Sequence, residues 1–249
     1  MELVAAVFIT AMFATPGIRL LRLRLRNGSG PEGWLAAFFL GLAIGIPLRL
    51  YLTGNATIAA DWARIGNRIA VLGLFTAAPS LTVFTWLVFR RNSRIAKLWT
   101  GLTICVLSAC CLALFALDQV ANQTHPVSML ANLWAISGFT WTFFECAQYY
   151  IRMRRRAEVG LGDPIVQNRF LLWSIWTGSF VFLPVVVFAI KITLLANTAP
   201  GEQVVAPAGL MTLVRVMVSI CSLSMLVSIW LSFFAPQAYL ARIRGEAST

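Results

Sequence analysis

The sequence has little charge, and very little of that charge is negative. Of its 249 residues, 12% are Asp, Glu, Lys or Arg, with nine acidic residues against 20 basic ones. A soluble domain carries charge on about a quarter of its residues. Apolar residues make up 59% of the chain. This composition excludes an ordinary soluble domain and indicates a polytopic membrane protein, because each spanning helix needs about 20 apolar residues.

Histidine and cysteine are also scarce. His125 is the single histidine, and the five cysteines form no CxxC pair, so the ligand cluster of a metal site is missing. HExxH, GxSxG, a Walker A loop and paired intramembrane aspartates are missing too. We therefore expect no catalytic residues, no metal, no cofactor and no enzymatic activity.

Long apolar runs are what the chain does have. We expect an all-α, seven-transmembrane-helix bundle that forms a single membrane domain. The seven predicted spans are residues 3–20, 34–52, 69–89, 97–117, 127–150, 170–195 and 208–234. The first run could be a signal peptide, but its basic residues follow the apolar stretch instead of preceding it, so we interpret it as a retained span.

The basic residues set the orientation of this bundle. Fifteen of the 20 fall in or beside four alternate connections, residues 21–33, 90–97, 151–169 and 235–249. The positive-inside rule makes these segments cytoplasmic, with the N-terminus outside and 235–249 a cytoplasmic tail. Arg far outnumbers Lys, which is typical of a high-GC bacterial genome, so we expect a multi-pass protein of a bacterial plasma membrane. The net charge of +11 then indicates anionic membrane lipids as partners and not nucleic acid.

The segment 55–68 precedes the third span and has the pattern of a short amphipathic helix at the outer interface. Ile58, Trp62 and Ile65 recur at helical spacing, while Asp61 and Arg64 are spaced for an i,i+3 ion pair. Such a helix either caps a pocket or rests on lipid headgroups.

Ionisable residues in or beside the outer half of the spans are candidates for a ligand cavity, because charge inside a membrane is costly. The candidates are Lys191, Arg215, Asp118, Arg68 and Asp61. We expect Lys191 and Arg215 to face the bundle interior, with Asp118 as the nearest acid. Together they favour a cationic outer cavity for an anionic or lipid-like ligand; the alternative is structural ion pairing. Glu145 lies near the cytoplasmic end of its span, where we expect cytoplasmic arginines as its partners.

A basic surface is predicted on the cytoplasmic side. It consists of Arg152, Arg154, Arg155, Arg156, Arg242 and Arg244. These residues bind either anionic lipid or a cytoplasmic signalling partner. We expect the seventh span to break at Pro236 and to continue as a short amphipathic element.

Glycine and proline mark positions inside the spans. Gly41 and Gly45 form a GxxxG motif, which favours close helix packing within the bundle or, alternatively, a homodimer. Four prolines within or near span ends are predicted to kink or break their helices. These are Pro16, Pro47, Pro79 and Pro184.

The segment 53–68, the Arg90–Arg91 turn, the basic loop 152–156 and the closing run FFAPQAYLAR at 233–242 together resemble two related groups. One is a group of uncharacterised actinobacterial seven-span membrane proteins; the other is the seven-span sensor region of bacterial sensor kinases. In the sensor group a similar segment leads into an output domain, whereas here the chain ends at Thr249. The resemblance implies a receptor or regulatory half whose output lies in another protein.

The leading prediction is therefore a sensory or regulatory membrane protein with an outer-facing cavity and a cytoplasmic basic surface. Two alternatives stay open. One is a transporter or lipid-handling protein, although no inverted repeat is visible. The other is a structural accessory subunit of a membrane complex.

Overall fold

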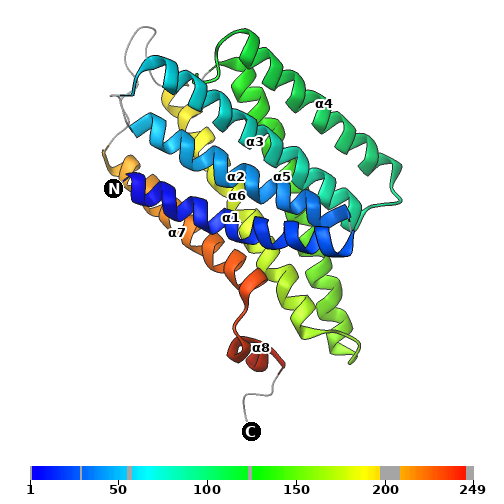
Figure 1. Cartoon of the computed structure of the whole chain (residues 1–249). Coiled ribbons are helices and arrows are strands. Elements are labelled where there is room, and N and C mark those ends of the chain that lie inside the picture. Colours follow the sequence, from blue (N-terminus) through cyan, green and yellow to red (C-terminus); the bar gives the residue numbers. More distant parts are fainter. Residues whose placement is uncertain (1, 29, 55–57, 123–124, 197–207, 245–249) are drawn as a thin grey trace. The chain divides into compact units, whose positions relative to one another are not determined.

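The computed structural model describes residues 2–28, 30–54, 58–122, 125–196 and 208–244. In these ranges the chain forms eight α-helices and no strand (Figure 1). The helices are α1 (Glu2–Asn27), α2 (Gly30–Gly54), α3 (Ala60–Phe89), α4 (Arg94–Ala116), α5 (Pro126–Glu158), α6 (Pro164–Ala196), α7 (Ala208–Phe234) and α8 (Gln237–Arg244). The predicted all-α class is confirmed.

Six helices in the described part of the chain are long and apolar enough to cross a membrane, namely α1, α2, α3, α4, α6 and α7. This is the architecture of a multi-pass membrane protein. The fifth predicted span belongs to α5, which has 33 residues but is not among the six. Its sequence interleaves polar and apolar residues, and its last turns are basic.

Two features of the helices differ from the sequence-based expectation. Residues 60–68 form the first turns of α3 and not a separate helix, while residues 55–57 lie outside the described residues. The helices also run unbroken through the four prolines, so of the two predicted effects, a kink or a break, the break is absent. Each proline removes only one bond of the helical ladder, and the remaining bonds hold the helix.

The chain divides into two compact units, Met1–Trp141 and Thr142–Thr249. In unit 1, α2 packs against both α1 and α3, and α4 packs on α3. Phe13 of α1 and Phe39 of α2 place their ring centroids 6.4 Å apart. The α1–α2 connection is tight because Gly28, at φ +65°, ends α1 in the left-handed conformation that glycine adopts without strain.

Glycine allows α2 and α3 to pack closely. A Cβ on Gly41 would lie 2.5 Å from the Gly73 carbonyl oxygen, and a Cβ on Gly73 would lie 3.0 Å from the Gly45 backbone nitrogen. The GxxxG motif of α2 therefore packs against Gly73 within the same chain, which is the first of its two predicted uses. Its glycines are buried and do not offer a surface for a second copy.

The first half of α5 packs against α4. Trp99 and Trp134 stack with centroids 5.4 Å apart, and the Trp134 indole N–H donates to the Thr103 hydroxyl oxygen at 3.2 Å. Ala78, Leu107 and Ala131, which come from α3, α4 and α5, belong to one buried apolar cluster, and Trp134 packs against it.

Unit 2 contains the second half of α5 with α6, α7 and α8. Tyr149 and Phe170 join α5 to α6, with centroids 5.3 Å apart. The hydroxyl oxygens of Ser179 and Ser224 lie 3.1 Å apart between α6 and α7. The break predicted at Pro236 is present, since α7 ends at Phe234 and α8 begins at Gln237.

Candidate ligand cavity

A cavity of about 220 Å³ lies in unit 1. The lining residues are Arg49, Val71, Leu74, Phe75, Leu114, Val120, Ser128 and Asn132. Val71, Leu114 and Val120 form one core cluster and are each at most 3% exposed. The cavity thus combines a tightly packed apolar wall with one guanidinium, one hydroxyl and one amide.

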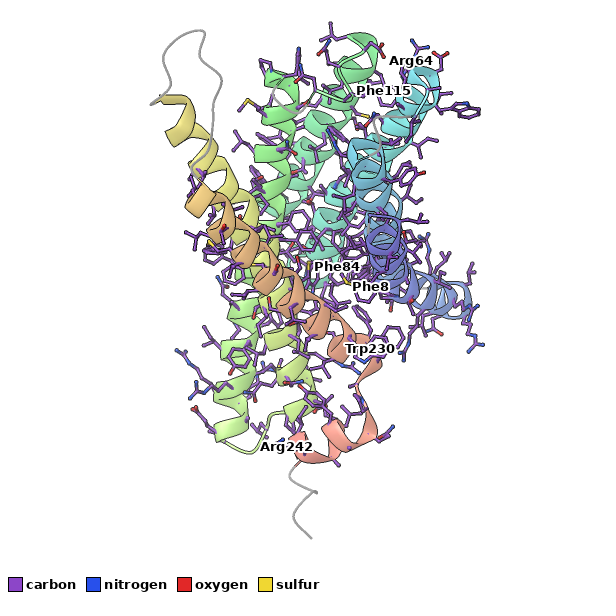
Figure 2. The ribbon with its side chains drawn as sticks, turned by 90° about the vertical axis from the view of Figure 1, so that its left-hand side faces the viewer. Phe8, Arg64, Phe84, Phe115, Trp230 and Arg242 are labelled. Carbon is purple, nitrogen blue, oxygen red and sulfur yellow. The ribbon has the colours of Figure 1, made fainter. Side chains whose placement is uncertain are left out.

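The lining residues come from one end of unit 1. Arg49 lies five residues before the end of α2, Leu114 two before the end of α4, and Ser128 two after the start of α5. At about 1.5 Å per residue, each is within about 8 Å of its helix end. Figure 2 shows Arg64 and Phe115 at this end of the unit, with Phe84 far along α3. The cavity therefore lies near the ends of α2, α4 and α5, with α3 passing beside it.

The turn after α4 shapes one wall of the cavity. Asp118 has a φ of +52°, and the backbone N–H groups of Asp118 and Gln119 donate to the carbonyl oxygens of Phe115 and Leu114. This is a Schellman motif with aspartate at the left-handed position where glycine is usual. The turn directs the chain across the end of the helices and so places Val120 in the cavity wall.

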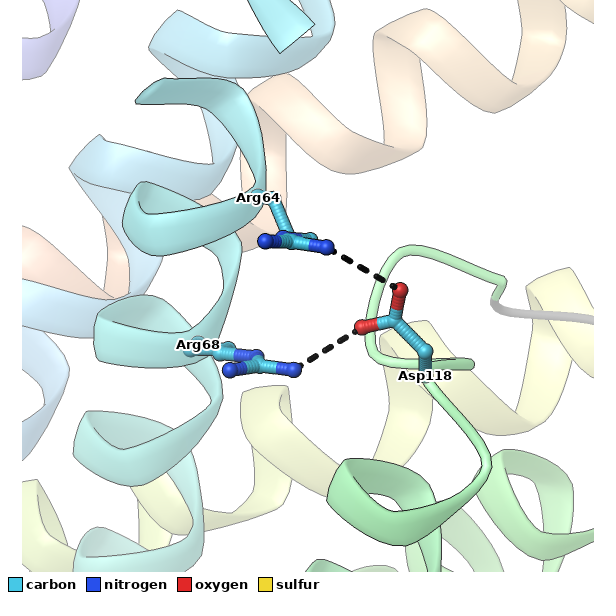
Figure 3. A network of polar contacts seen from close by, with 3 residues as sticks. All are labelled: Arg64, Arg68 and Asp118. Carbon is cyan, nitrogen blue, oxygen red and sulfur yellow. Dashed lines mark hydrogen bonds and ion pairs between the residues drawn. The ribbon is translucent and has the colours of Figure 1, made fainter. Parts of the chain in front are cut away.

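Two arginines of α3 hold this turn. Arg68 Nη2 donates to Asp118 Oδ1 at 3.0 Å, and Arg64 Nη1 lies 4.0 Å from Oδ2 (Figure 3). The guanidinium carbon of Arg68 also lies 5.7 Å from the centroid of the Phe115 ring. Arg68 is three residues before Val71, and Asp118 is two before Val120, so this clamp lies at the rim of the cavity.

The start of α3 is amphipathic, as predicted. The ion pairs of its polar face, however, differ from the predicted pair of Asp61 with Arg64. Arg64 and Arg68 face Asp118, and among the described residues no ion pair joins Asp61 to Arg64. Trp62 is 68% exposed, and Ile65 and Ile69 are exposed as well. The apolar face is therefore directed away from the cavity, which is the orientation of an interfacial helix turn in contact with lipid.

Of the five predicted cavity candidates, the structure brings Arg68 and Asp118 together. Asp61 is exposed at the start of α3. Lys191 lies in α6 and Arg215 in α7, but their side chains are outside the described residues, so the prediction that they face inward stays a prediction.

Sequence reasoning missed Arg49 and Ser128 as cavity residues and gave Asn132 no ligand role. Arg49, Ser128 and Asn132 all lie within two turns of helix ends on the same side of the bundle, but the sequence gives no signal that they face a cavity.

Glu145 is buried, with 5% exposure for the residue. Helix α5 continues for 13 residues beyond it and carries the arginine-rich segment to Glu158. The expectation that cytoplasmic arginines are its partners stays a prediction.

The predicted basic surface lies in unit 2. The side chains of Arg152, Arg154, Arg155, Arg156 and Arg242 are exposed, whereas that of Arg244 is outside the described residues. Arg154 pairs with Glu158 at 3.7 Å, one turn along α5.

One contact ties α8 to α6 and was not anticipated. The Asn168 amide nitrogen donates to the Tyr239 hydroxyl at 2.8 Å, and that hydroxyl lies 3.2 Å from the Asn168 amide oxygen. Tyr239 and Leu240 are half-buried, while Arg242 is exposed. The contact gives α8 a defined attachment to the start of α6.

The fold is that of a helical multi-pass membrane protein with a cavity of about 220 Å³ in unit 1. No family model, curated protein or solved structure matches the chain. The resemblance to seven-span sensor regions stays a prediction.

Proposed function

We propose that this chain is a sensory or regulatory integral membrane protein of the bacterial plasma membrane. It crosses the membrane seven times with its N-terminus outside. The cavity of unit 1 then faces outward and receives a ligand, while the basic surface of unit 2 faces the cytoplasm and carries the signal to a partner. The positive-inside distribution of 15 of the 20 basic residues supports this orientation.

The observation that carries the proposal is the continuity of α5. The same helix contributes Ser128 and Asn132 to the cavity and carries the run Arg154–Arg156 near its other end. Its 33 residues extend for about 50 Å, more than the hydrocarbon thickness of about 30 Å. A ligand that moves the first turns of α5 would therefore act on an element that also ends in the basic surface.

The inward direction of its polar residues supports α5 as a membrane span in addition to the six apolar helices. Ser128, Thr142 and Glu145 are buried, whereas Leu130, Leu133 and Phe144 are exposed. A helix of this kind offers apolar side chains to lipid although its mean hydropathy is modest. The composition of α5 is thus compatible with crossing the membrane.

The proposal is tested by purification from native membranes in mild detergent. A stoichiometric cytoplasmic partner that is lost when Arg154, Arg155 and Arg156 are replaced by Gln supports it. The control variant replaces Arg22, Arg24 and Arg26, which belong to another basic connection. A stable complex with another membrane protein would instead show an accessory subunit. Recovery of the chain alone, together with ligand flux in proteoliposomes, would show a transporter.

A further inference from the structure

The charged groups in and around the cavity of unit 1 are already engaged within the chain. Arg49, the charged member of the eight lining residues, interacts with another group of the protein. At the rim, the Asp118 carboxylate pairs with Arg68 and lies close to Arg64. A charged ligand would have to leave its hydration shell for a largely apolar space whose charged groups have other partners, which is costly. The cavity is therefore suited to an uncharged molecule.

Asn132 is the lining residue that offers a hydrogen bond to such a molecule. The Ser128 hydroxyl donates to the Asn122 carbonyl oxygen at 2.8 Å, so its proton is in use. The Asn132 side chain forms no hydrogen bond within the described part of the chain, and it is the exposed member of the lining. An amide donates through its nitrogen and accepts through its oxygen. One carbonyl or hydroxyl group on the ligand therefore satisfies it at the opening of the cavity.

The apolar wall sets a second requirement for the ligand. Val71, Leu114 and Val120 are each at most 3% exposed, and Leu74 and Phe75 complete the wall. Each methylene that moves from water to a wall of this kind strengthens binding about fourfold. A mainly apolar molecule that is oriented by a few polar groups is what such sites bind. The ligand therefore needs an alkyl chain or a ring beside its polar group.

The volume limits the size of the ligand. An engineered protein cavity of about 150 Å³ holds benzene, which corresponds to about 25 Å³ for each non-hydrogen atom. By that measure the 220 Å³ of this cavity holds about nine such atoms. The ketone 2-heptanone and benzyl alcohol have eight each, whereas a long-chain fatty acid or a phospholipid is far too large.

We infer that the cavity binds a small uncharged ketone or alcohol with a short alkyl chain or a single ring. Its oxygen lies on the Asn132 amide and its apolar part among Val71, Leu114 and Val120. This ligand differs from the anionic or lipid-like one expected from the sequence, which depended on Lys191 and Arg215. The inference rests on the proposed function for the role of the cavity, and it names the class of ligand.

The test is saturable binding of radiolabelled 2-heptanone to the full chain in lipid nanodiscs, after subtraction of empty nanodiscs. Unlabelled competitors are compared by their free aqueous concentrations. We expect benzyl alcohol to compete, and acetone to compete about 100-fold less well or worse because it lacks four methylenes. Heptane should compete about 2- to 10-fold less well because it lacks the hydrogen bond. Hexanoate, hexylamine and 2-dodecanone should each compete at least tenfold less well.

Three results would overturn the inference. Hexanoate or hexylamine competing as well as 2-heptanone would show that the site takes a charged ligand. A ranking in which 2-dodecanone competes best would remove the size limit and show a site for lipid chains. Absence of saturable binding above that of empty nanodiscs would refute a ketone site as a whole.

Two variants locate the site. Asn132→Leu keeps the size of the side chain and removes the amide, so it should weaken 2-heptanone binding about 2- to 10-fold and abolish the preference for 2-heptanone over heptane. The matched control is Asn92→Leu, an exposed asparagine in the turn before α4. It should change neither, because Leu114 lies about 30 Å further along that helix. A preference that survives in Asn132→Leu would overturn the role of Asn132.

Val120→Phe fills part of the cavity from the turn after α4 and should weaken binding at least tenfold. Unchanged binding in this variant, with a circular dichroism spectrum like that of the unsubstituted chain, would place 2-heptanone elsewhere and overturn the inference. The outcome is separable from that of the proposed function. Binding of 2-heptanone by a chain that has no partner refutes the regulatory role and supports the site, whereas a partner without 2-heptanone binding supports the regulatory role and refutes the site.

Discussion

At the scale of single residues, Asp118 adopts an unfavourable backbone conformation and takes part in two ion pairs. Its left-handed φ of +52° is unfavourable for a residue with a Cβ, although aspartate tolerates it better than most. Its carboxylate accepts from Arg68 and lies close to Arg64. The three side chains are 40–56% exposed, so each pair is worth less than about 1 kcal/mol. The ion pairs of Asp118 therefore add little to global stability and act mainly to hold the turn after α4.

Asp118→Asn and Asp118→Gly separate these two effects. Asparagine keeps the tolerance for positive φ but loses the charge, so we expect a loss of about 1 kcal/mol or less in unfolding free energy. Glycine also loses the charge but removes the backbone strain, which regains about 1 kcal/mol. Thermal unfolding should therefore rank Asp118→Gly at or above Asp118→Asn. The reverse order would show that the left-handed turn carries no strain. In both variants, hydrogen exchange at residues 119–122 should become faster.

The sequence identified Asp118 and Arg68 as candidates but not as each other's partners. They are 50 residues apart, and only the packing of α3 against α4 brings them together. The i,i+3 spacing of Asp61 and Arg64 instead suggested a local pair. Arg49 shows the same limit, because its distance along the chain from a helix end does not tell whether its side chain faces lipid, water or a cavity.

At the scale of elements, glycines bring α2 and α3 into close backbone contact. Gly41, Gly45 and Gly73 each have backbone atoms of the opposite helix within 3.0 Å of the position of a Cβ. The GxxxG spacing in α2 predicted close packing, but the facing pair Gly73 and Ala77 of α3 was identified as its partner only in the structure.

Gly73→Ala is expected to destabilise unit 1 by about 1–3 kcal/mol, because the new methyl group forces α2 and α3 apart. The matched control is Gly101→Ala in α4, where nothing lies within 4 Å of the added Cβ. There we expect no loss, since alanine has the higher helix propensity. Thermal unfolding in detergent compares the two. Equal melting temperatures for the two variants would mean that the helices tolerate separation at Gly73.

A second element-scale prediction concerns α8, whose attachment the sequence did not reveal. Tyr239→Phe keeps the aromatic ring and removes the hydroxyl bonded to Asn168. We expect little change in global stability, about 1 kcal/mol or less, but faster hydrogen exchange across residues 237–244. Under the proposed function, partner binding should weaken as well. Gln237→Ala, at an exposed position of the same helix, is the control. If exchange in Tyr239→Phe stays as slow as in the control, the hydroxyl contact does not hold α8.

At the scale of the whole molecule, the sequence predicted the helical class and the positions of the apolar helices, because these depend on composition and run length. It could not predict the cavity, which depends on the meeting of the ends of α2, α4 and α5 with the middle of α3 and the turn after α4. One predicted span, residues 127–150 in α5, is neither confirmed nor excluded by the structure. Helix α5 is long enough to span the membrane but lies below the hydropathy of the six helices that qualify on composition.

The orientation of the molecule depends on α5, since the connection that follows it is cytoplasmic only if α5 crosses the membrane. We expect Glu158→Cys, introduced into a cysteine-free background, to resist membrane-impermeant maleimide in intact cells and to react after permeabilisation. Ala121→Cys, in the connection between α4 and α5, should react in intact cells. Both positions are exposed in the structure, so a lack of labelling reflects the membrane and not burial. Labelling of both positions in intact cells would show that α5 does not cross the membrane, and the basic surface would then face outward, where no cytoplasmic partner can reach it.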